Sequence, residues 1–279
     1  MDAFLHQVLA GLATGGIYAS LALALVMIYQ ATHLVNFAQG EMAMFTTYIA
    51  WSLVNAGMSY WAAFFLTIVF AFVMGVLIER IVIRPVENAP VLAVVVVFIA
   101  LLVILNSVAG WIYTYTIKSF PSPFPKEAFF STRFMSPHEM GAIGITLVVL
   151  VLLFAFFRFT PLGLAMRAAA QNPQSSRLVG IRVGWMLALG WGLAAAIGGV
   201  AGMMVAPIVY LDPNMMGGVL LYAFAAALVG GFMVGVLENV LGAFVIGNEL
   251  KLPMALVLII GVLLVRPSGF FGKVHVTRV

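Results

Sequence analysis

Three polar side chains, Asn36, Gln39 and Glu41, lie close together just before an apolar run that continues to Val54. An ionisable group near membrane depth is costly, so Glu41 is a candidate functional residue by default. Gly40 permits an unwound backbone, and a carboxylate near a helix N-terminus is favoured by the helix dipole. The alternative is that Glu41 caps the start of an interfacial helix in contact with water. Our hypothesis is that these three side chains line a pathway across the membrane.

A second acid, Glu238, also lies inside an apolar run. It either lines the pathway or pairs with a cation from a neighbouring helix, or it lies near an interface where water solvates it. Tyr18 lies next to a stripe of small residues, Gly11, Gly15 and Ala19. Small residues spaced by four let another helix come close. The stripe therefore predicts helix packing first, with Tyr18 as a further candidate for the pathway.

The segment 158–183 is polar and basic and contains no Asp or Glu. Its arginines are Arg158, Arg167, Arg177 and Arg182. Apolar runs flank it, and short loops rich in Arg and Lys stay on the cytoplasmic side of a membrane. Residues 162–170 have helix-forming composition, and Pro173 is expected to stop or bend that helix. We therefore expect a cytoplasmic loop with a short amphiphilic helix that a partner protein grips. The alternative is a solvated connector whose arginines only set the topology.

The composition determines the broad class of protein. The chain is 64% apolar and only 8% charged, with a mean hydropathy of +1.16. Soluble domains average about 25% charged residues. The sequence therefore predicts an integral membrane protein. The first apolar run is too long for the core of a signal peptide, so we expect it to be a retained span.

Several other classes of protein are not expected. The net charge is +4, but there is no dense basic face of the kind that binds nucleic acid. Cysteine is absent, which rules out structural disulfides and thiolate metal sites, and the four histidines are scattered, so no metal is expected. No phosphate-binding Gly-x-x-x-x-Gly-Lys-Ser/Thr loop is present, and we expect no cofactor. An intramembrane hydrolase would need a Ser/His pair or paired aspartates, but the aspartates are Asp2 and Asp212. We therefore expect no catalytic residues.

The order of the apolar runs predicts the fold. Runs of about 20 apolar residues are long enough to cross a bilayer, so we expect an all-α, polytopic membrane protein with about eight transmembrane helices in a single domain, 1–279. The predicted spans are roughly 4–29, 42–54, 60–81, 89–113, 141–157, 185–207, 217–247 and 252–265.

Charges assign the sides of the membrane. Arg80 and Arg84 mark the end of the third span as cytoplasmic, which agrees with segment 158–183 because two spans separate them. The intervening loop, 114–140, is rich in Pro, Phe and Ser and is expected to be external, although Lys118, Lys126 and Arg133 weakly oppose this.

The segment 217–247 creates a conflict in this topology. A single crossing there, followed by the last span, leaves the basic tail with Arg266, Lys273 and Arg278 outside. One resolution is that 217–247 turns back near Gly230-Gly231 as half-depth helices, which are tolerated where protein or a water-filled cavity covers the turn. The other is an unusual topology. The sequence leaves both open.

Five short motifs occur in order along the chain: 16–21 (GIYASL), 35–41 (VNFAQGE), 84–86 (RPV), 163–168 (GLAMRA) leading to 178–181 (LVGI), and 266–269 (RPSG). In this order they resemble the permease subunit of bacterial branched-chain amino acid ABC transporters. The resemblance covers nearly the whole chain.

This resemblance implies an ABC importer permease in the bacterial inner membrane that works by alternating access. Two cytoplasmic ATPase subunits, a second related permease subunit and a periplasmic substrate-binding protein would be its partners, besides membrane lipid. The cargo would be a branched-chain or related amino acid. The residues that contact the ATPase would be Gly163, Arg167, Ala168, Arg177 and Gly180.

The chain departs from the family pattern at two places. Gln171 and Asn172 stand where the resemblance implies acidic residues, and one Gly-Gly pair, Gly230-Gly231, stands where it implies two, as though a short stretch were missing. The other function that we consider is a secondary transporter or channel for small organic solutes, which needs no ATPase.

Overall fold

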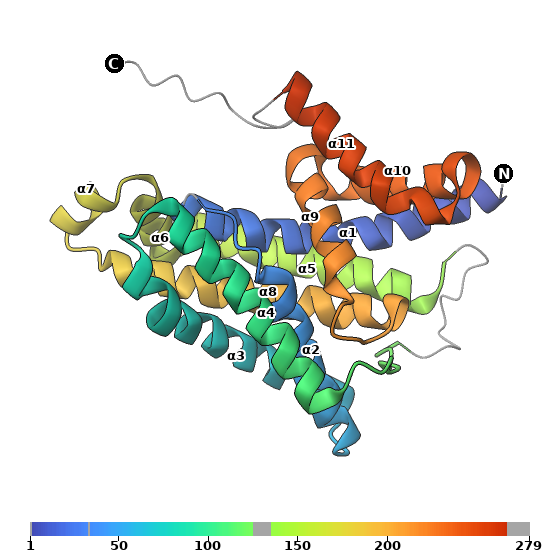
Figure 1. Cartoon of the computed structure of the whole chain (residues 1–279), viewed down its shortest axis with the longest axis horizontal. Helices are drawn as coiled ribbons and strands as arrows, with labels where there is room; N and C mark the ends of the chain where they lie inside the picture. The colour runs from blue at the N-terminus through green and yellow to red at the C-terminus, as the bar shows by residue number, and fades with distance from the viewer. Residues whose placement is uncertain (1, 33, 125–134, 267–279) are drawn as a thin grey trace. The chain divides into compact units, whose positions relative to one another are not determined.

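The computed structural model describes residues 2–32, 34–124 and 135–266. Within these ranges the regular structure is helical, apart from isolated β-bridge residues such as the pair Lys118 and Leu211 (Figure 1). The α-helices are α1 (Asp2–Thr32), α2 (Gln39–Asn55), α3 (Tyr60–Ile78), α4 (Val91–Tyr113), α5 (Pro137–Phe159), α6 (Pro161–Gln171), α7 (Pro173–Leu178), α8 (Val183–Val209), α9 (Met216–Val229), α10 (Gly231–Leu241) and α11 (Lys251–Val265). Short π and 3₁₀ turns are η1 (Glu79–Ile83), η2 (Arg84–Val86), η3 (Gly242–Ile246) and η4 (Asn248–Leu250).

The lengths and composition of these helices confirm a polytopic all-α membrane protein. Five helical stretches, beginning at residues 2, 60, 91, 137 and 183, are long and apolar enough to cross a bilayer, and three shorter apolar helices begin at 216, 231 and 251. The predicted spans agree with helices to within a few residues, with one exception. The stretch 217–247 is divided at Gly230, which lies between the end of α9 and the start of α10 and has a φ of +109°. Glycine adopts this backbone conformation without the steric cost that a side chain would bring. The helix therefore breaks where the first of the two resolutions places its turn, and the half-depth helices of that resolution stay a prediction.

The chain divides into two compact units. The larger comprises 23–123 and 147–216, and the smaller comprises 1–22, 124–146 and 217–279. Of the predicted features, residues 125–134 of the external loop, with Lys126 and Arg133, lie outside the described residues, as do His33 and the tail 267–279 with Lys273, His275 and Arg278.

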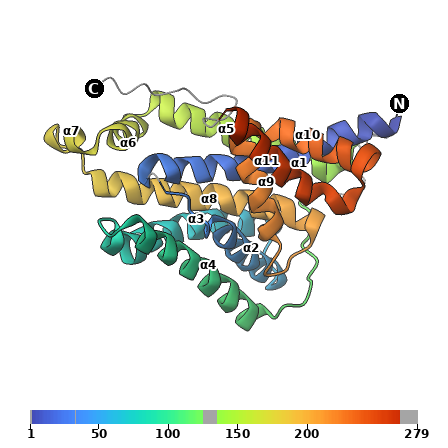
Figure 2. The same ribbon diagram turned by 45° about the horizontal axis from the view of Figure 1, so that its top comes forward.

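The larger unit is built around α8, which packs against α2 and α3, while α2 also packs against α4 (Figure 2). Small residues on α8 make this packing close. A Cβ atom on Gly202 would lie 2.8 Å from the main-chain oxygen of Ala43 in α2. Around these contacts lies an apolar core whose buried members include Ile28, Met42, Phe98, Leu101 and Trp191.

The two ends of the larger unit collect different segments. At one end, a cavity is lined by residues of the 79–88 turn and of α7, including Glu79, Glu87 and Arg177. At the other end, Lys118 and Leu211 form the β-bridge, and Trp51 donates a hydrogen bond to the carbonyl of Ser119 at 3.2 Å. The turn with Arg80 and Arg84 therefore lies at the same end of the unit as segment 158–183, as two intervening spans require.

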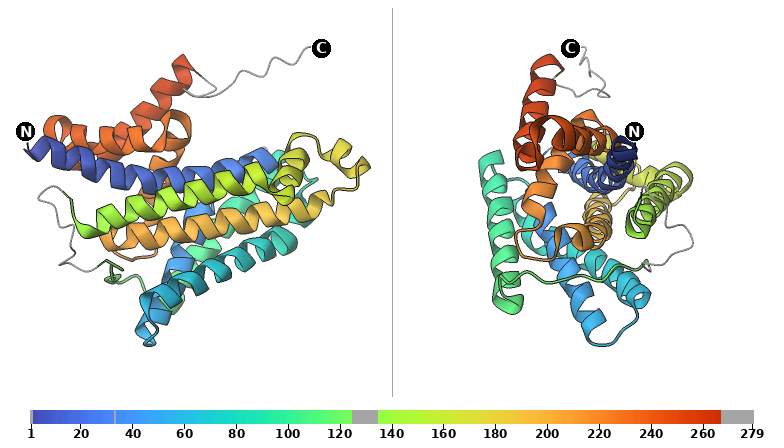
Figure 3. Two further views of the ribbon diagram at one scale, coloured as in Figure 1. Left: turned by 180° about the vertical axis from the view of Figure 1, so that it is seen from behind. Right: turned by 90° about the vertical axis from the view of Figure 1, so that its right-hand side faces the viewer.

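The smaller unit contains the N-terminal part of α1 side by side with α10 (Figure 3). A Cβ atom on Gly11 or Gly15 would lie 2.7 Å from the main-chain oxygen of Gly235 or Gly231, respectively. Asn239 of α10 donates a hydrogen bond to the Thr14 hydroxyl at 3.0 Å. The small-residue stripe that the sequence predicted to be a helix-packing face is therefore confirmed as one.

Candidate functional site

The first candidate site lies at the start of α2, which begins deep inside the larger unit. The non-helical residues 34–38 lead from α1 into α2, and Gln39 is completely buried. Gln39 donates a hydrogen bond to the carbonyl of Ala194, near the middle of α8, at 2.9 Å. The first turn of α2 therefore lies at the level of the middle of a membrane-spanning helix. Interrupted helices of this kind are tolerated at membrane depth where protein covers the irregular backbone.

Asn36 and Gln39 are joined to each other and to the surrounding backbone. The Asn36 side-chain oxygen accepts a hydrogen bond from the main-chain N–H of Ala38 at 3.0 Å, and its amide lies 3.5 Å from the Gln39 side-chain oxygen. Both side chains are fully buried. They satisfy polar backbone groups that would otherwise be orphaned at the break between α1 and α2. Whether they also contact cargo stays a prediction.

Glu41 lies two residues beyond Gln39 and meets a different partner. The side-chain amide of Asn106, on α4, lies 3.4 Å from the Glu41 carboxylate. The same amide donates a hydrogen bond to the carbonyl of Pro213 at 2.8 Å and lies 3.3 Å from the Asn214 side-chain oxygen. Glu41 is 7% exposed. A nearly buried carboxylate with an amide partner can attract a cationic group, such as the ammonium of an amino acid.

Asn106 is a functional candidate that the sequence reasoning missed. It lies in the apolar run of α4, where the residues around it read LVILNSVAG. A lone amide in a membrane-spanning helix is a signal of the same kind as Glu41, and it could have identified the residue. Asn106 connects α4, the start of α2 and the 212–214 turn of the larger unit.

The second candidate site lies in the smaller unit and brings Tyr18 and Glu238 together. The hydroxyls of Tyr18 and Tyr222 both lie near the Glu238 carboxylate and interact with it electrostatically. The two tyrosine rings stack with centroids 5.0 Å apart. Glu238 is 8% exposed, and its Oε2 atom has no hydrogen-bond partner within the described structure. Tyr222 was not among the predicted residues, because its contact with Glu238 depends on the turn between α9 and α10.

Segment 158–183 forms two short helices with well-defined ends. The Thr160 hydroxyl accepts a hydrogen bond from the N–H of Gly163 at 3.0 Å and caps α6. Asn172 does the same for α7 by accepting from the N–H of Ser175 at 3.0 Å. The predicted helix and its interruption at Pro173 are therefore confirmed. Capping side chains of this type each stabilise a helix by about 1 kcal/mol.

Two glycines fix the shape of this segment. A Cβ atom on Gly163 would lie 2.7 Å from the Cα atom of Phe157, so only glycine lets α6 fold back onto the end of α5. Gly180 has a φ of +85° and follows α7, and the N–H of Ile181 bonds the carbonyl of Ser176 at 3.0 Å. This is the glycine-terminated helix end that satisfies the last carbonyl groups.

The predicted contact residues of the segment differ in exposure. Gly163 is buried, with Met166 and Ala169, on the inner face of α6. Arg167 and Arg177 are exposed, and Ala168 is half-buried beside Arg167. The short amphipathic helix α6 thus presents a cationic side chain on its outer face.

Glu79 anchors the end of α3 and belongs to neither candidate site. Its carboxylate is 3.2 Å from the Arg84 guanidinium and 3.8 Å from that of Arg80. Arg84 also bonds the carbonyl of Gly184 at the start of α8, and Arg80 stacks 3.7 Å over the Trp185 ring. This charge network ties the 79–86 turn to α8.

The fold, the start of α2 at membrane depth and the polar clusters within apolar helices define a polytopic membrane protein with buried polar groups. Its family is the one described as branched-chain amino acid transport system / permease component, to which the chain belongs by a match over residues 7–265. The resemblance inferred from the sequence motifs is confirmed.

The chain is similar to named permeases along nearly its whole length. It is 28% identical to the high-affinity branched-chain amino acid transport system permease protein LivH of Salmonella typhimurium, over 99% of this chain and 98% of that protein. The corresponding protein BraD of Pseudomonas aeruginosa is also 28% identical, with the same coverage. A probable branched-chain amino acid transport permease protein of Methanocaldococcus jannaschii is 27% identical over 90% of this chain and 87% of its own length.

Proposed function

We propose that this chain is the membrane-spanning permease subunit of an ATP-driven importer. It translocates a branched-chain or related amino acid that a periplasmic binding protein delivers. Family membership and the names of the similar permeases support the cargo class. The chain would work in the bacterial inner membrane beside a second, related permease subunit. ATP hydrolysis would take place on two separate cytoplasmic subunits, so the chain itself is not an enzyme.

The observation that carries this proposal is the capped pair of helices α6 and α7 between the membrane-spanning helices α5 and α8. The segment is short and tightly held, because Gly163 brings it against the end of α5 and Gly180 ends it. Its outer face carries Arg167 and Arg177 with no acid in the segment. A rigid cationic element of this kind can dock on an ATPase and transmit its closure to α5 and α8. Gly163, Arg167, Ala168, Arg177 and Gly180 would form or shape this contact.

The cargo pathway would use the two polar sites. Asn36 and Gln39 hold the interrupted backbone, which leaves Glu41 and Asn106 to meet the polar end of an amino acid. Tyr18 and Glu238 would serve a similar role in the smaller unit. The apolar surroundings suit an aliphatic side chain, because burial of apolar surface stabilises binding.

Co-purification tests the proposed partner. The chain would be co-expressed with candidate ATPase subunits from its own genome, and the ATPases retained on the tagged permease would be measured. We expect Arg167→Glu to abolish retention, because it reverses the charge at the centre of the exposed face of α6. The control is Arg266→Glu, which reverses the charge of an exposed arginine outside segment 158–183. We expect this variant to keep the ATPases bound.

Uptake in proteoliposomes separates this function from the alternative. A secondary transporter or channel would move solute without ATP and would be unaffected by Arg167→Glu. Leucine uptake that proceeds equally with and without ATP would contradict the proposal.

A further inference from the structure

A long groove runs beside the α5–α6 corner in the larger unit. It has a volume of about 620 Å³. The C-terminal half of α1 contributes one wall, and the C-terminal half of α5 contributes the other. Its lining residues are Leu23, Val26, Met27, Gln30, Leu150, Leu153, Phe154, Phe157, Arg158 and Arg167. The groove is therefore apolar along most of its length and polar at one end.

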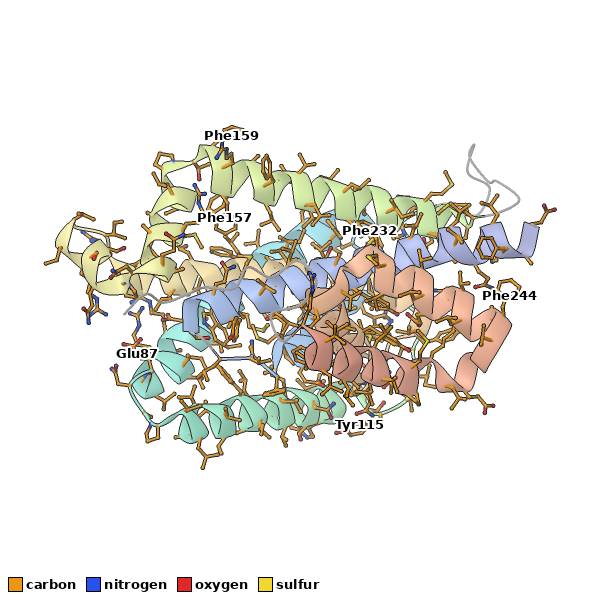
Figure 4. All side chains as sticks on the ribbon, turned by 90° about the horizontal axis from the view of Figure 1, so that it is seen from above. Glu87, Tyr115, Phe157, Phe159, Phe232 and Phe244 are labelled. Atoms are coloured by element: carbon orange, nitrogen blue, oxygen red, sulfur yellow. The ribbon has the colours of Figure 1, made fainter. Side chains whose placement is uncertain are left out.

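The orientation of α5 places this groove on the side of the unit that faces the lipid bilayer. Phe157 lies on the side of α5 that faces the groove, whereas Phe159 points to the opposite side (Figure 4). The outer face of α5 is exposed at Val151, Leu152 and Phe154. In a chain that spans a bilayer, this face meets hydrocarbon chains and not water.

The polar end of the groove carries two positive charges that no carboxylate among the described residues pairs with. Arg158 lies in the last turn of α5, and the exposed Arg167 of α6 lines the same groove. The ion pairs found among the described residues join Glu79 to Arg80 and Arg84, and neither groove arginine takes part in one. No Asp or Glu lines the groove.

The depth of these arginines matches the headgroup region. A helix of 23 residues, such as α5, is about 34 Å long at a rise of 1.5 Å per residue. The hydrocarbon core of a bilayer is about 30 Å thick. If α5 spans the bilayer, its last residues, Arg158 included, therefore lie at the edge of this core. Guanidinium groups bind phosphate through paired hydrogen bonds, and basic pockets between membrane helices bind anionic headgroups.

We propose that this groove is a binding site for one anionic phospholipid. An acyl chain lies between α1 and α5 against Val26, Leu150 and Phe154, and the phosphate lies between Arg158 and Arg167. Charge complementarity selects this occupant. A helix of a second protein subunit would have to bring acidic residues to the same two arginines, whereas an anionic lipid of the surrounding membrane carries the phosphate already. Because Arg167 belongs to α6, the bound lipid would join α6 to the membrane-spanning helices.

Native mass spectrometry of the purified full chain tests this site. The chain would be equilibrated with equal amounts of phosphatidylglycerol and phosphatidylcholine of identical acyl chains. We expect wild type to retain phosphatidylglycerol preferentially and Arg158→Gln/Arg167→Gln to lose this preference. About 1 kcal/mol per cationic side chain corresponds to about fivefold for each arginine removed. The matched control Arg177→Gln/Arg182→Gln removes two charges from the same segment but outside the groove, and it should keep the preference.

A second variant tests the apolar part of the groove. Leu150→Trp fills part of the groove between α1 and α5 and is expected to reduce retention of both lipids. All variants would be compared for monodispersity and helix content, so that loss of fold is recognised. Retention of phosphatidylglycerol by Arg158→Gln/Arg167→Gln at the level of wild type would overturn the proposal. Equal retention of both lipids by wild type, or a bound second copy of the chain in place of lipid, would overturn it as well. Because the measurement is lipid retention, it is independent of whether the chain imports amino acids.

Discussion

The side-chain amide of Gln39 donates a hydrogen bond to the main-chain oxygen of Ala194 at 2.9 Å, and this bond joins the first turn of α2 to the middle of α8. Both residues are fully buried. The bond therefore holds the start of α2 at a fixed depth. Asn36 and Glu41, the candidates for the pathway, lie beside Gln39 at the same depth.

We expect Gln39→Met to lower the free energy of unfolding by about 1 kcal/mol, because it keeps the length of the side chain but removes the donor. Unfolding in mixed micelles by a denaturing detergent, followed by circular dichroism, measures this change. Gln171→Met is the matched control, since Gln171 is exposed at the end of α6. Equal stability of the two variants would show that the Gln39 bond contributes nothing.

Glu41 is expected to act on transport and not on stability. Glu41→Gln keeps an oxygen that can accept from Asn106 but removes the negative charge that would attract an ammonium group. A hydrogen bond to a charged group is worth about 1.5–3 kcal/mol, so we predict at least about a tenfold loss of uptake at subsaturating leucine. The assay is ATP-driven uptake by the complete reconstituted complex.

Glu249→Gln is the control for this prediction, because Glu249 is exposed and lies outside both candidate sites. Uptake by Glu41→Gln at the wild-type rate would remove Glu41 from the pathway. A loss of uptake accompanied by an equal loss in Glu249→Gln would point to a general effect of charge.

The contact between α1 and α10 in the smaller unit predicts opposite effects for two glycines. A Cβ atom on Gly235 would collide with the backbone of Gly11 and Gly15, whereas nothing lies within 4 Å of the corresponding position on Gly261 of α11. In an open helical position, replacing Gly by Ala stabilises the helix by up to about 1 kcal/mol. Overpacking costs about 1–3 kcal/mol. We therefore expect Gly235→Ala to be destabilising and Gly261→Ala to be neutral or stabilising in thermal unfolding. The same sign for both would contradict the close contact.

The helices themselves could be predicted from the sequence because membrane-spanning segments reveal their length by hydropathy alone. In segment 158–183, the helix-forming composition of 162–170 and the position of Pro173 predicted the helix and its end, because such signals act within a few residues. The caps Thr160 and Asn172 were found only in the structure. The break at Gly230 was one of two alternatives, since a glycine pair permits a positive φ but does not require it.

The partners of the polar residues could not be predicted in the same way. Asn36, Gln39 and Glu41 are close in sequence, yet Gln39 meets α8 whereas Glu41 meets Asn106 of α4. Successive residues of a helix point in different directions, so their partners depend on which helix lies on each side. Glu238 and Tyr18, by contrast, are far apart in sequence and are joined only because α10 packs along α1.

The contact of Tyr18 with Glu238 gives the last prediction. Glu238 is a buried acid that interacts with the nearby hydroxyls of Tyr18 and Tyr222. Tyr18→Phe removes one of these polar neighbours, and leaving a buried polar group poorly satisfied costs about 1–3 kcal/mol. Glu238→Leu removes the carboxylate, so that the tyrosine hydroxyl loses this polar neighbour. If the two groups act through each other, the double variant should be more stable than the sum of the single effects predicts, with a coupling of at least about 0.5 kcal/mol. Detergent unfolding of the four proteins measures this coupling.

Tyr210→Phe, at an exposed tyrosine of the larger unit, should show no coupling with Glu238→Leu. Additive effects of Tyr18→Phe and Glu238→Leu would mean that the two residues are neighbours without a shared energetic role.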